Sequence, residues 1–530
     1  MPLDGATNVG RAIATVGEPV LLVYKDDGAL AVARGGTLEF GSESAQATAY
    51  PMAGYAPVSS PDQLGDAAFR RDHGLRYAYV AGAMANGIAS TRLAQEMGRA
   101  GMLGVFGAAG LSLERVEAAI DELSHSLPDN SYGFNLIHSP NEPALEAGVV
   151  SLYLRRGIAL VEASAYLRLT LPLVRYRVSG IARDAQGRIV APNRIIAKVS
   201  RVEVASQFFS PPPDEFLTEL VRTRDISPEQ AVLAASVPMA QDLTAEADSG
   251  GHTDNRPLVT LLPTMLALRD RMQVKHNYAA RLRVGAAGGL STPSALAAAF
   301  SMGAAYVLTG SVNQACVESG SSDVVRSMLA LAEQADIAMA PAADMFEMGV
   351  RVQVLKRGTM FPMRAAKLYE LYRTHAGLES LSEADRAFVE KQILRAPIED
   401  AWRSTRAFFA RRDPAQVERA ERDPKHRMAL VFRSYLGLSS RWANSGDSTR
   451  VMDYQVWCGP SMGAFNEWVR GSFLERPENR RAVLVGQNLL YGAALQLRRQ
   501  YLGAQGIQLP VGIADGLPLE QQALMRVTNP

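Results

Sequence analysis

The chain has 530 residues, and 47% of them are hydrophobic, so it can bury a large core or fold as about two to three domains. Its 55 lysines and arginines balance 54 acidic residues, which argues against a general affinity for nucleic acid or for anionic membranes. The two cysteines are too few for a disulfide framework or a cysteine-rich metal site. We recognise neither a secretory leader nor an apolar run long enough to span a bilayer, so we expect a cytoplasmic, enzyme-sized protein without a metal centre.

Residues 1–74 predict a small, β-rich N-terminal domain. Short β-like runs at residues 19–24 and 30–34 precede a stretch rich in proline and glycine at residues 50–65. The pattern changes after this stretch, so we place a domain boundary near residue 74.

From residue 75 onward, short apolar runs alternate with segments of helical periodicity, which indicates βα units and a parallel sheet. The expected strands are at residues 77–81, 102–106, 133–137, 159–163, 195–199, 243–247, 282–286 and 304–308. Eight strands close a (β/α)8 TIM barrel, which we place at residues 75–316. Between the fourth and fifth strands, residues 174–192 predict a hairpin insertion that turns near residues 184–187.

The loops after the seventh and eighth strands are candidates for a phosphate site. Gly288 and Gly289 follow the seventh strand, and their missing β-carbons let backbone N–H groups approach an anion. Thr292 is a candidate N-cap with Pro293 at the first helical position, so the helix dipole favours an anion there. The loop after the eighth strand contains Thr309, Gly310 and Ser311. These two loops commonly hold a phosphate in (β/α)8 barrels, although the glycine pair also suits an ordinary strand-to-helix turn.

Polar residues follow several other strands, at the barrel face where catalysis takes place. Lys198 lies near the end of the fifth strand, where its ammonium must find a ligand, a structural carboxylate or solvent. Asn135 ends the third strand and suits either a ligand contact or a turn. His252 follows Gly250 and Gly251 after the sixth strand, and we favour a role in proton transfer over a simple loop hydrogen bond.

Beyond Cys316 the barrel pattern stops. Residues 317–440 predict a helical insertion or cap, and residues 441–530 are expected to pack back on the barrel with a helix at residues 483–502. Cys316 itself lies past the eighth strand, so we interpret it as a structural residue rather than a nucleophile.

Several motifs carry a family resemblance. In chain order they are GAMANGIAS, YGFNL, the strand with Lys198, EADSGGH, GAAGG and TGS. This series resembles the 2-nitropropane dioxygenase and nitronate monooxygenase superfamily of flavoproteins, which includes flavin enoyl-acyl-carrier-protein reductases. The longer strings MFEMGVRVQVLKRGTMFPMRAAKLYELY and DYQVWCGPSMGAFNEWVRGS resemble the PfaD-type subgroup. Members of this subgroup are trans-acting enoyl reductases of polyunsaturated fatty acid synthases and trans-acyltransferase polyketide synthases.

The resemblance implies FMN at the barrel mouth and NAD(P)H as the hydride source. The cofactor contacts it implies are Ala83, Met84, Asn135, Lys198, Asp248, Gly250, Gly251, Gly288, Gly289, Thr309, Gly310 and Ser311. His252 and Lys198 would be catalytic: His252 delivers a proton to the α-carbon of an α,β-unsaturated thioester or orients its carbonyl, and a fixed cation or amide stabilises the reduced flavin. Asp248 orients the histidine, supports the flavin edge or is structural.

The expected partner is an acyl carrier protein of a polyketide or fatty acid synthase, and a homodimer is a further expectation. Four cations of the insertion are candidates for meeting an acidic carrier, although a solvated helix face is the favoured interpretation. They are Lys356, Arg357, Arg364 and Lys367. The long insertion departs from the broader superfamily, as does Ser311 after the Thr-Gly pair. A nitronate monooxygenase and a non-catalytic barrel retained in a synthase assembly remain alternatives.

Overall fold

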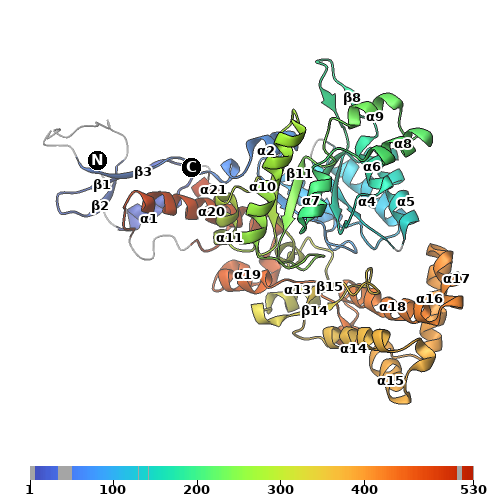
Figure 1. Ribbon diagram of the computed structural model, residues 1–530. Helices are drawn as coiled ribbons and strands as arrows, with labels where there is room; N and C mark the ends of the chain where they lie inside the picture. Colours follow the sequence, from blue (N-terminus) through green and yellow to red (C-terminus); the bar gives the residue numbers. More distant parts are fainter. Residues whose placement is uncertain (1–5, 34–49, 129–130, 141, 510–515, 529–530) are drawn as a thin grey trace.

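The computed structural model describes residues 6–33, 50–128, 131–140, 142–509 and 516–528. At its centre, with helices packed around it (Figure 1), is a closed barrel of eight parallel strands. Their order around the barrel, β10-β11-β12-β13-β4-β5-β6-β7, follows the chain. They are β4 (Tyr79–Ala81), β5 (Leu103–Phe106), β6 (Tyr132–Ile137), β7 (Leu160–Ser164), β10 (Arg194–Val199), β11 (Asp242–Glu246), β12 (Arg283–Ala287) and β13 (Val307–Thr309). The structure thus confirms the predicted (β/α)8 barrel.

Helices cover the outside of the barrel, and polar side chains fix where many of them begin. Ser90, Ser112, Thr170 and Thr292 each accept a hydrogen bond from a backbone N–H in the first turn of the helix that follows. The helices are α3 (Thr91–Arg99), α4 (Leu113–Ser126), α5 (Pro143–Arg155), α6 (Leu171–Val178), α7 (Val202–Phe208), α8 (Asp214–Arg222), α9 (Pro228–Ala234), α10 (Leu258–His276) and α11 (Pro293–Ser301).

The predicted hairpin insertion is present as β8 (Ala182–Arg183) and β9 (Ile189–Val190). Its turn is held by the side chain of Asp184, whose Oδ1 accepts from the backbone N–H groups of Gln186 and Arg188. The position of the turn therefore matches the sequence prediction.

Buried ion pairs close the amino end of the barrel. Arg283, which is 3% exposed, donates from Nε to Asp242 Oδ1 at 2.6 Å and from Nη1 to Asp72 Oδ2 at 2.6 Å. His73 lies 2.9 Å from Asp242, at the end of the short helix α2 (Ala67–Asp72). Burial alone would raise the pKa of Asp242, but His73 and Arg283 outweigh it and lower that pKa to about 2. This end is thus sealed by charge pairing, and the opposite end remains open for a ligand.

The N-terminal strands share a hydrophobic core with the C-terminal helix. The sheet order is β2-β1-β3, with β1 (Val20–Tyr24), β2 (Leu30–Ala33) and β3 (Met52–Ala56), and helix α1 (Ala6–Ala14) packs beside it. Leu22 and Val20 lie in one cluster with Tyr491 and Leu502 of α20 (Ala482–Ala504), and Leu524 of α21 (Gln521–Thr528) completes it. The predicted β-runs and C-terminal helix are confirmed, and residue 34, the end of the second run, lies outside the described residues.

Helix α20 also touches the barrel. A β-carbon on Gly492 would lie 2.5 Å from Cγ of Pro293 at the start of α11, so the two helices approach as closely as a glycine allows. Helix α20 therefore joins the N-terminal sheet to the barrel, and the sequence analysis had not predicted its contact with that sheet.

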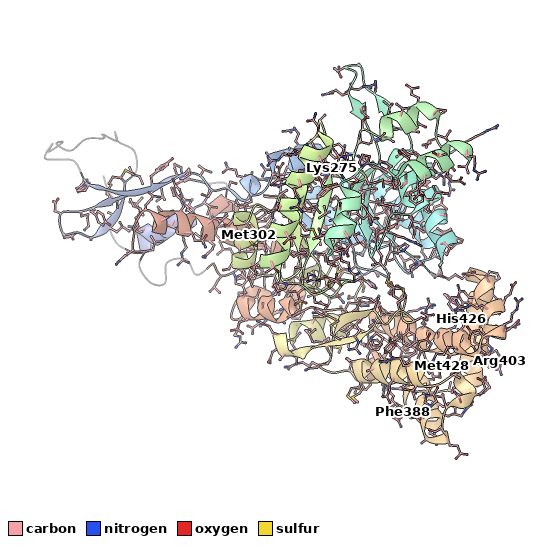
Figure 2. All side chains as sticks on the ribbon, viewed as in Figure 1. Lys275, Met302, Phe388, Arg403, His426 and Met428 are labelled. Carbon is pink, nitrogen blue, oxygen red and sulfur yellow. The ribbon has the colours of Figure 1, made fainter. Side chains whose placement is uncertain are left out.

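After β13, residues 337–457 form a unit that we call the cap, which has a hydrophobic cluster of its own and contains a β-hairpin that the sequence did not predict. The hairpin pairs β14 (Ile337–Pro341) with β15 (Arg351–Leu355). Between β13 and residue 470 the helical elements are α12 (Ser311–Gln314), α13 (Asp323–Ala330), η2 (Gln334–Asp336), α14 (Phe361–Thr374), η3 (Leu378–Ser380), α15 (Glu383–Phe388), the π-helical η4 (Val389–Leu394), α16 (Ile398–Arg412), α17 (Pro414–Arg422), α18 (Pro424–Ser445), η5 (Ser448–Asp453) and α19 (Ser461–Val469). Figure 2 shows His426 and Met428 of α18 within this unit, where both side chains are buried.

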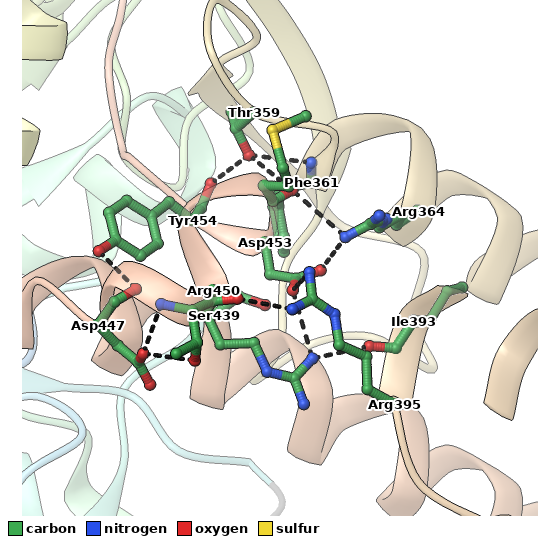
Figure 3. Close-up of polar contacts among 12 residues, drawn as sticks. Thr359, Phe361, Arg364, Ile393, Arg395, Ser439, Asp447, Arg450, Asp453 and Tyr454 are labelled. Carbon is green, nitrogen blue, oxygen red and sulfur yellow. Dashed lines mark hydrogen bonds and ion pairs between the residues drawn. The ribbon is translucent and has the colours of Figure 1, made fainter. Parts of the chain in front are cut away.

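A buried carboxylate ties the cap helices together (Figure 3). Asp453 is fully buried and receives the guanidinium groups of Arg364, Arg395 and Arg450, the latter two at 3.2 and 3.3 Å. Tyr435 of α18 donates to the same carboxylate at 2.9 Å. Because these groups come from α14, the end of η4, η5 and α18, one carboxylate fixes four elements.

Residues 456–459 run beside β15 of the hairpin on the way back to the barrel. Leu355 N–H donates to Val456 O at 2.9 Å, and Cys458 N–H donates to Gln353 O at 3.2 Å. This pairing carries residues 456–459 from the cap to the barrel loops. In the described part of the chain, none of the helices has both the length and the apolar character needed to cross a membrane.

Candidate active site

A cavity of about 1070 Å³ lies between the carboxyl ends of the barrel strands and the cap. Each of the eight barrel strands contributes residues to its wall, either from the strand itself or from the loop that follows it. From the barrel these include Gly82, Ala83, Met84, Asn135, Ser164, Lys198, Gly250, Gly251, His252, Gly288, Gly289, Thr309, Gly310 and Ser311. The cap contributes Asp344, residues of α16 and α18, and Trp457. The structure thus brings nearly all the predicted site residues to one cavity.

The predicted phosphate loops meet at this cavity and leave space at their glycines. Gly288 has φ +85°, and a β-carbon there would lie 2.6 Å from the carbonyl carbon of Ala247. At Gly289 and Gly310, by contrast, an added β-carbon would have no described atom within 4 Å. This open glycine surface suits the close approach of a phosphate to the backbone.

The helix N-termini that reach the cavity near these glycines are not the one that the sequence predicted. Thr292 does cap α11, accepting from the N–H of Ala295, but the described cavity wall from this loop ends at Leu290. The short α12 begins at Ser311, which is in the wall, and Ser461 at the start of α19 is also in it. Gly459 N–H donates to Ser311 Oγ at 3.4 Å, which anchors the C-terminal segment at the seat. Sequence reasoning missed Ser461 because nothing local indicated that this segment returns to the barrel mouth.

Lys198 projects into the cavity between two buried carboxylates. Its Nζ lies 3.5 Å from Glu162 Oε1 on β7 and 3.4 Å from Glu246 Oε1 on β11. The lysine side chain is 11% exposed, and burial alone would lower its pKa, but the attraction of the two carboxylates outweighs burial and raises it. The structure therefore fixes an ammonium ion at the cavity wall.

Glu162 and Glu246 are site residues that the sequence analysis did not single out. Burial raises the pKa of Glu162, whereas the nearby ammonium lowers it, and the net shift is upward. Its Oε1 accepts from the backbone N–H of Ala83 at 3.3 Å, and its buried Oε2 has no partner among the described atoms. The available signal was an acid inside each of two short, buried strands, Glu162 in β7 and Glu246 in β11, since a buried charge requires a partner.

Asn135 is held in the wall by its own amide. Its Nδ2 donates to Glu162 O at 3.2 Å and to Ser164 Oγ at 3.1 Å, and the residue is 5% exposed. These bonds fix the direction of the side chain in the cavity wall.

His252 is paired with a residue of the cap. Its Nε2 lies 3.1 Å from Asp344 Oδ1, and its ring centroid lies 6.2 Å from that of Trp457. Burial would lower the pKa of His252, but Asp344 outweighs it and the net shift is upward. An imidazole in this setting keeps its proton to a higher pH than a free histidine does.

Of the three roles that the sequence left open for Asp248, its contacts fit the structural one. Its Oδ1 accepts from Asn255 Nδ2 at 2.9 Å and from Gln353 Nε2 at 2.6 Å, and it is absent from the described cavity wall. The carboxylate that holds His252 is therefore Asp344, which comes from the loop of the unpredicted hairpin. Asp248 instead fixes the loop after β11 to β15.

Gly250 and Gly251 lie where a β-carbon would come close to neighbouring atoms. A β-carbon on Gly251 would lie 2.7 Å from Glu246 Oε1, and one on Gly250 would lie 3.2 Å from Cys458 N.

Cys316 and Cys458 are both buried, and burial raises the pKa of each thiol. Neither is in the described cavity wall, which agrees with a structural interpretation of Cys316.

The four cap cations do not form a free cationic face. Arg357 pairs with Asp336 and Glu333, Lys367 pairs with Glu370 and Asp385, and Arg364 is committed to the buried Asp453. Lys356 is exposed. The solvated surface that the sequence favoured therefore fits Lys356, Arg357 and Lys367, whereas Arg364 belongs to the interior of the cap.

Fold and cavity together define a (β/α)8-barrel protein with an open glycine surface, a fixed ammonium and a carboxylate-paired histidine at the carboxyl ends of the strands. Residues 73–387, more than half of the chain, match the nitronate monooxygenase family. The chain belongs to this family. Residues 375–454 of the cap match the inserted helical domain of [acyl-carrier-protein] S-malonyltransferase.

Relatives place the chain more narrowly. It is 49% identical over 429 residues to a polyunsaturated fatty acid synthase subunit of Thraustochytrium sp., and the match covers 80% of this chain and 29% of that protein. It is 44% identical over 440 residues to polyketide biosynthesis protein PksE of Bacillus subtilis, covering 83% and 57%. The enoyl reductase domain of MlnA from the macrolactin cluster of Bacillus amyloliquefaciens is 38% identical with a TM-score of 0.79, covering 84% of this chain and 99% of that structure.

These similarities confirm the resemblance to the PfaD-type subgroup. The chain spans less than two thirds of the length of either full-length relative named above. Its similarity to the MlnA domain, in contrast, extends over nearly the whole of that structure.

Proposed function

We propose that the chain is an FMN-dependent enoyl reductase that acts in trans and uses NAD(P)H to reduce the α,β-double bond of acyl groups on an acyl carrier protein. The observation that carries this proposal is the single cavity that joins the glycine seat, Lys198 and His252 and continues beneath the cap. Similarity to proteins of polyunsaturated fatty acid and polyketide synthesis and to an enoyl reductase domain supports the substrate class.

The residues present suit FMN. The open space at Gly289 and Gly310 accommodates a phosphate, with Gly288 and Ser311 beside it. Lys198 and Asn135 supply a cation and an amide where the electron-accepting ring would lie, close to Ala83 and Met84. When bound, this cofactor would take a hydride from the nicotinamide and supply one to the β-carbon of the enoyl thioester.

Lys198 provides a permanent positive charge in a mostly buried wall. Negative charge that develops nearby during reduction is stabilised more strongly there than in water, because the surroundings are less polarisable. Glu162 and Glu246 keep the ammonium protonated and in place.

His252 supplies the proton that the α-carbon needs after hydride addition. Addition of hydride to the β-carbon puts negative charge on the α-carbon and the thioester oxygen, and a proton from the imidazolium then forms the α-carbon–hydrogen bond. Asp344 stabilises the imidazolium, and the imidazole regains a proton from solvent. The same ring can instead donate a hydrogen bond to the thioester oxygen.

The test is reduction and reoxidation of the purified protein without oxygen. Flavin absorbance should accompany the protein, NAD(P)H should bleach it, and a crotonyl thioester should restore it. Reoxidation by oxygen in the presence of a propyl nitronate, with no response to the thioester, would instead establish the nitronate monooxygenase that the family match favours. A colourless protein that takes up no FMN would leave the non-catalytic alternative.

A further inference from the structure

Two arginines of the cavity wall lack an acidic partner. Arg115 on α4 and Arg441 on α18 are exposed, and neither has an ion pair among the described residues. The other two arginines of the wall are paired, Arg412 with Glu142 at 2.6 Å and Arg433 with Glu347 at 3.2 Å. The wall therefore carries two positive charges, on Arg115 and Arg441, that no carboxylate of the described residues pairs with.

The carboxylates of the wall are already engaged. Glu142 accepts from Arg412, Glu146 accepts from Tyr166 at 3.1 Å, and Glu246 and Asp344 hold the site lysine and histidine. Since these acids have partners of their own, the two arginines remain available to an anionic ligand.

Both arginines flank one junction between the cap and the barrel. Asn86 Nδ2 donates to Ser440 Oγ at 3.1 Å, which joins the loop after β4 to α18. A β-carbon on Gly110 would lie 2.2 Å from Asn86 Oδ1, so the loop before α4 packs against the same asparagine. Arg441 follows Ser440 directly, and Arg115 lies in the first turn of α4.

The wall also contains apolar side chains suited to an acyl chain. Leu111, Leu145, Val149, Phe408 and Leu438 all line the cavity, and Phe408 is 48% exposed there. A ligand that fits has an acyl group bound among these side chains and a phosphate that reaches the arginines, whose planar guanidinium groups match phosphate oxygens.

We propose that Arg115 and Arg441 bind the phosphate of the 4′-phosphopantetheine arm that carries the acyl group. This inference rests on the proposed function and deepens it by assigning the residues that recognise the arm. The same chemistry would also suit a phosphate of the nicotinamide dinucleotide, and the experiment separates these two sources.

The experiment compares two substrates that differ by one phosphate, crotonyl-4′-phosphopantetheine and crotonyl-pantetheine. For each of Arg115→Gln and Arg441→Gln in the FMN-loaded protein, kcat/KM for the phosphorylated substrate should fall about tenfold, mainly through KM. Values for crotonyl-pantetheine, and the rate of flavin reduction by NAD(P)H, should stay within about twofold. Arg403→Gln is the matched control, because Arg403 is exposed on α16, lies outside the described cavity wall and pairs only with Asp400 among the described residues.

Equal losses with both substrates, or no loss with either, would overturn the assignment. Slower flavin reduction by NAD(P)H in the arginine variants would indicate that these arginines bind the dinucleotide instead, and would overturn the assignment as well. Calorimetric titration with 4′-phosphopantetheine gives an answer independent of turnover: the proposal expects binding to the wild type that the double variant loses. If this binding is found while no enoyl thioester is reduced, the proposed function fails and the arm site stands.

Discussion

Replacement of Asp453 by asparagine should destabilise the cap selectively. Asparagine keeps the shape of the side chain but removes the charge shared by three arginines, so two mostly buried guanidinium groups and the more exposed Arg395 lose their counter-ion. Removing one partner of a buried ion pair costs about 3–5 kcal/mol. Because Arg364 and Arg450 keep 14% and 16% exposure and both also donate to backbone carbonyl groups, we expect about 2–4 kcal/mol here.

Hydrogen exchange followed by mass spectrometry measures this effect region by region. Peptides from α14 and α18 should exchange faster by about two orders of magnitude, whereas barrel strands should keep their protection. Tyr435→Phe removes one hydrogen bond to the same carboxylate and should cost about 1 kcal/mol. Asp400→Asn breaks an exposed pair with Arg403 and should cost at most about 0.5 kcal/mol. If Asp453→Asn matched this exposed control, the buried carboxylate would not be what holds the cap helices together.

Three further predictions concern the cavity. Lys198→Met should lower the rate of enoyl reduction by about 10²–10³-fold while the protein stays folded, measured by stopped-flow reoxidation and circular dichroism; an unchanged rate would refute the electrostatic role. Asp344→Asn removes the group that raises the pKa of His252, so the fall of kcat at alkaline pH should begin at a lower pH than in wild type; a coincident pH–rate profile would contradict proton donation by His252. Gly310→Val should abolish flavin retention during gel filtration without unfolding the protein, because its side chain would enter open space at the seat; full retention would place the phosphate elsewhere.

The sequence by itself determined the barrel and most of the residues around its mouth. Strand-length apolar runs separated by helical segments are local patterns, and so are glycine pairs and N-caps such as Thr292, which act within a few residues of themselves. Asn135, Lys198 and His252 were singled out for a related reason, since each lies in the carboxyl half of a strand or in the loop after it, and these parts of the strands meet at one face of a barrel.

Only the tertiary structure decided what these residues touch. In the strand register, Ile196 of β10 lies opposite Glu162 of β7, and Lys198 lies opposite Thr244 of β11, two residues before Glu246. The carboxylates of Glu162 and Glu246 therefore come from the two flanking strands to the same ammonium. The partner of His252 lies 92 residues further along the chain, on a hairpin whose strands no local pattern had indicated. The core shared by the N-terminal strands and α20 was equally hidden. Periodicity determines which face of an element is apolar, but the choice of partner depends on packing between distant segments, which local sequence does not encode.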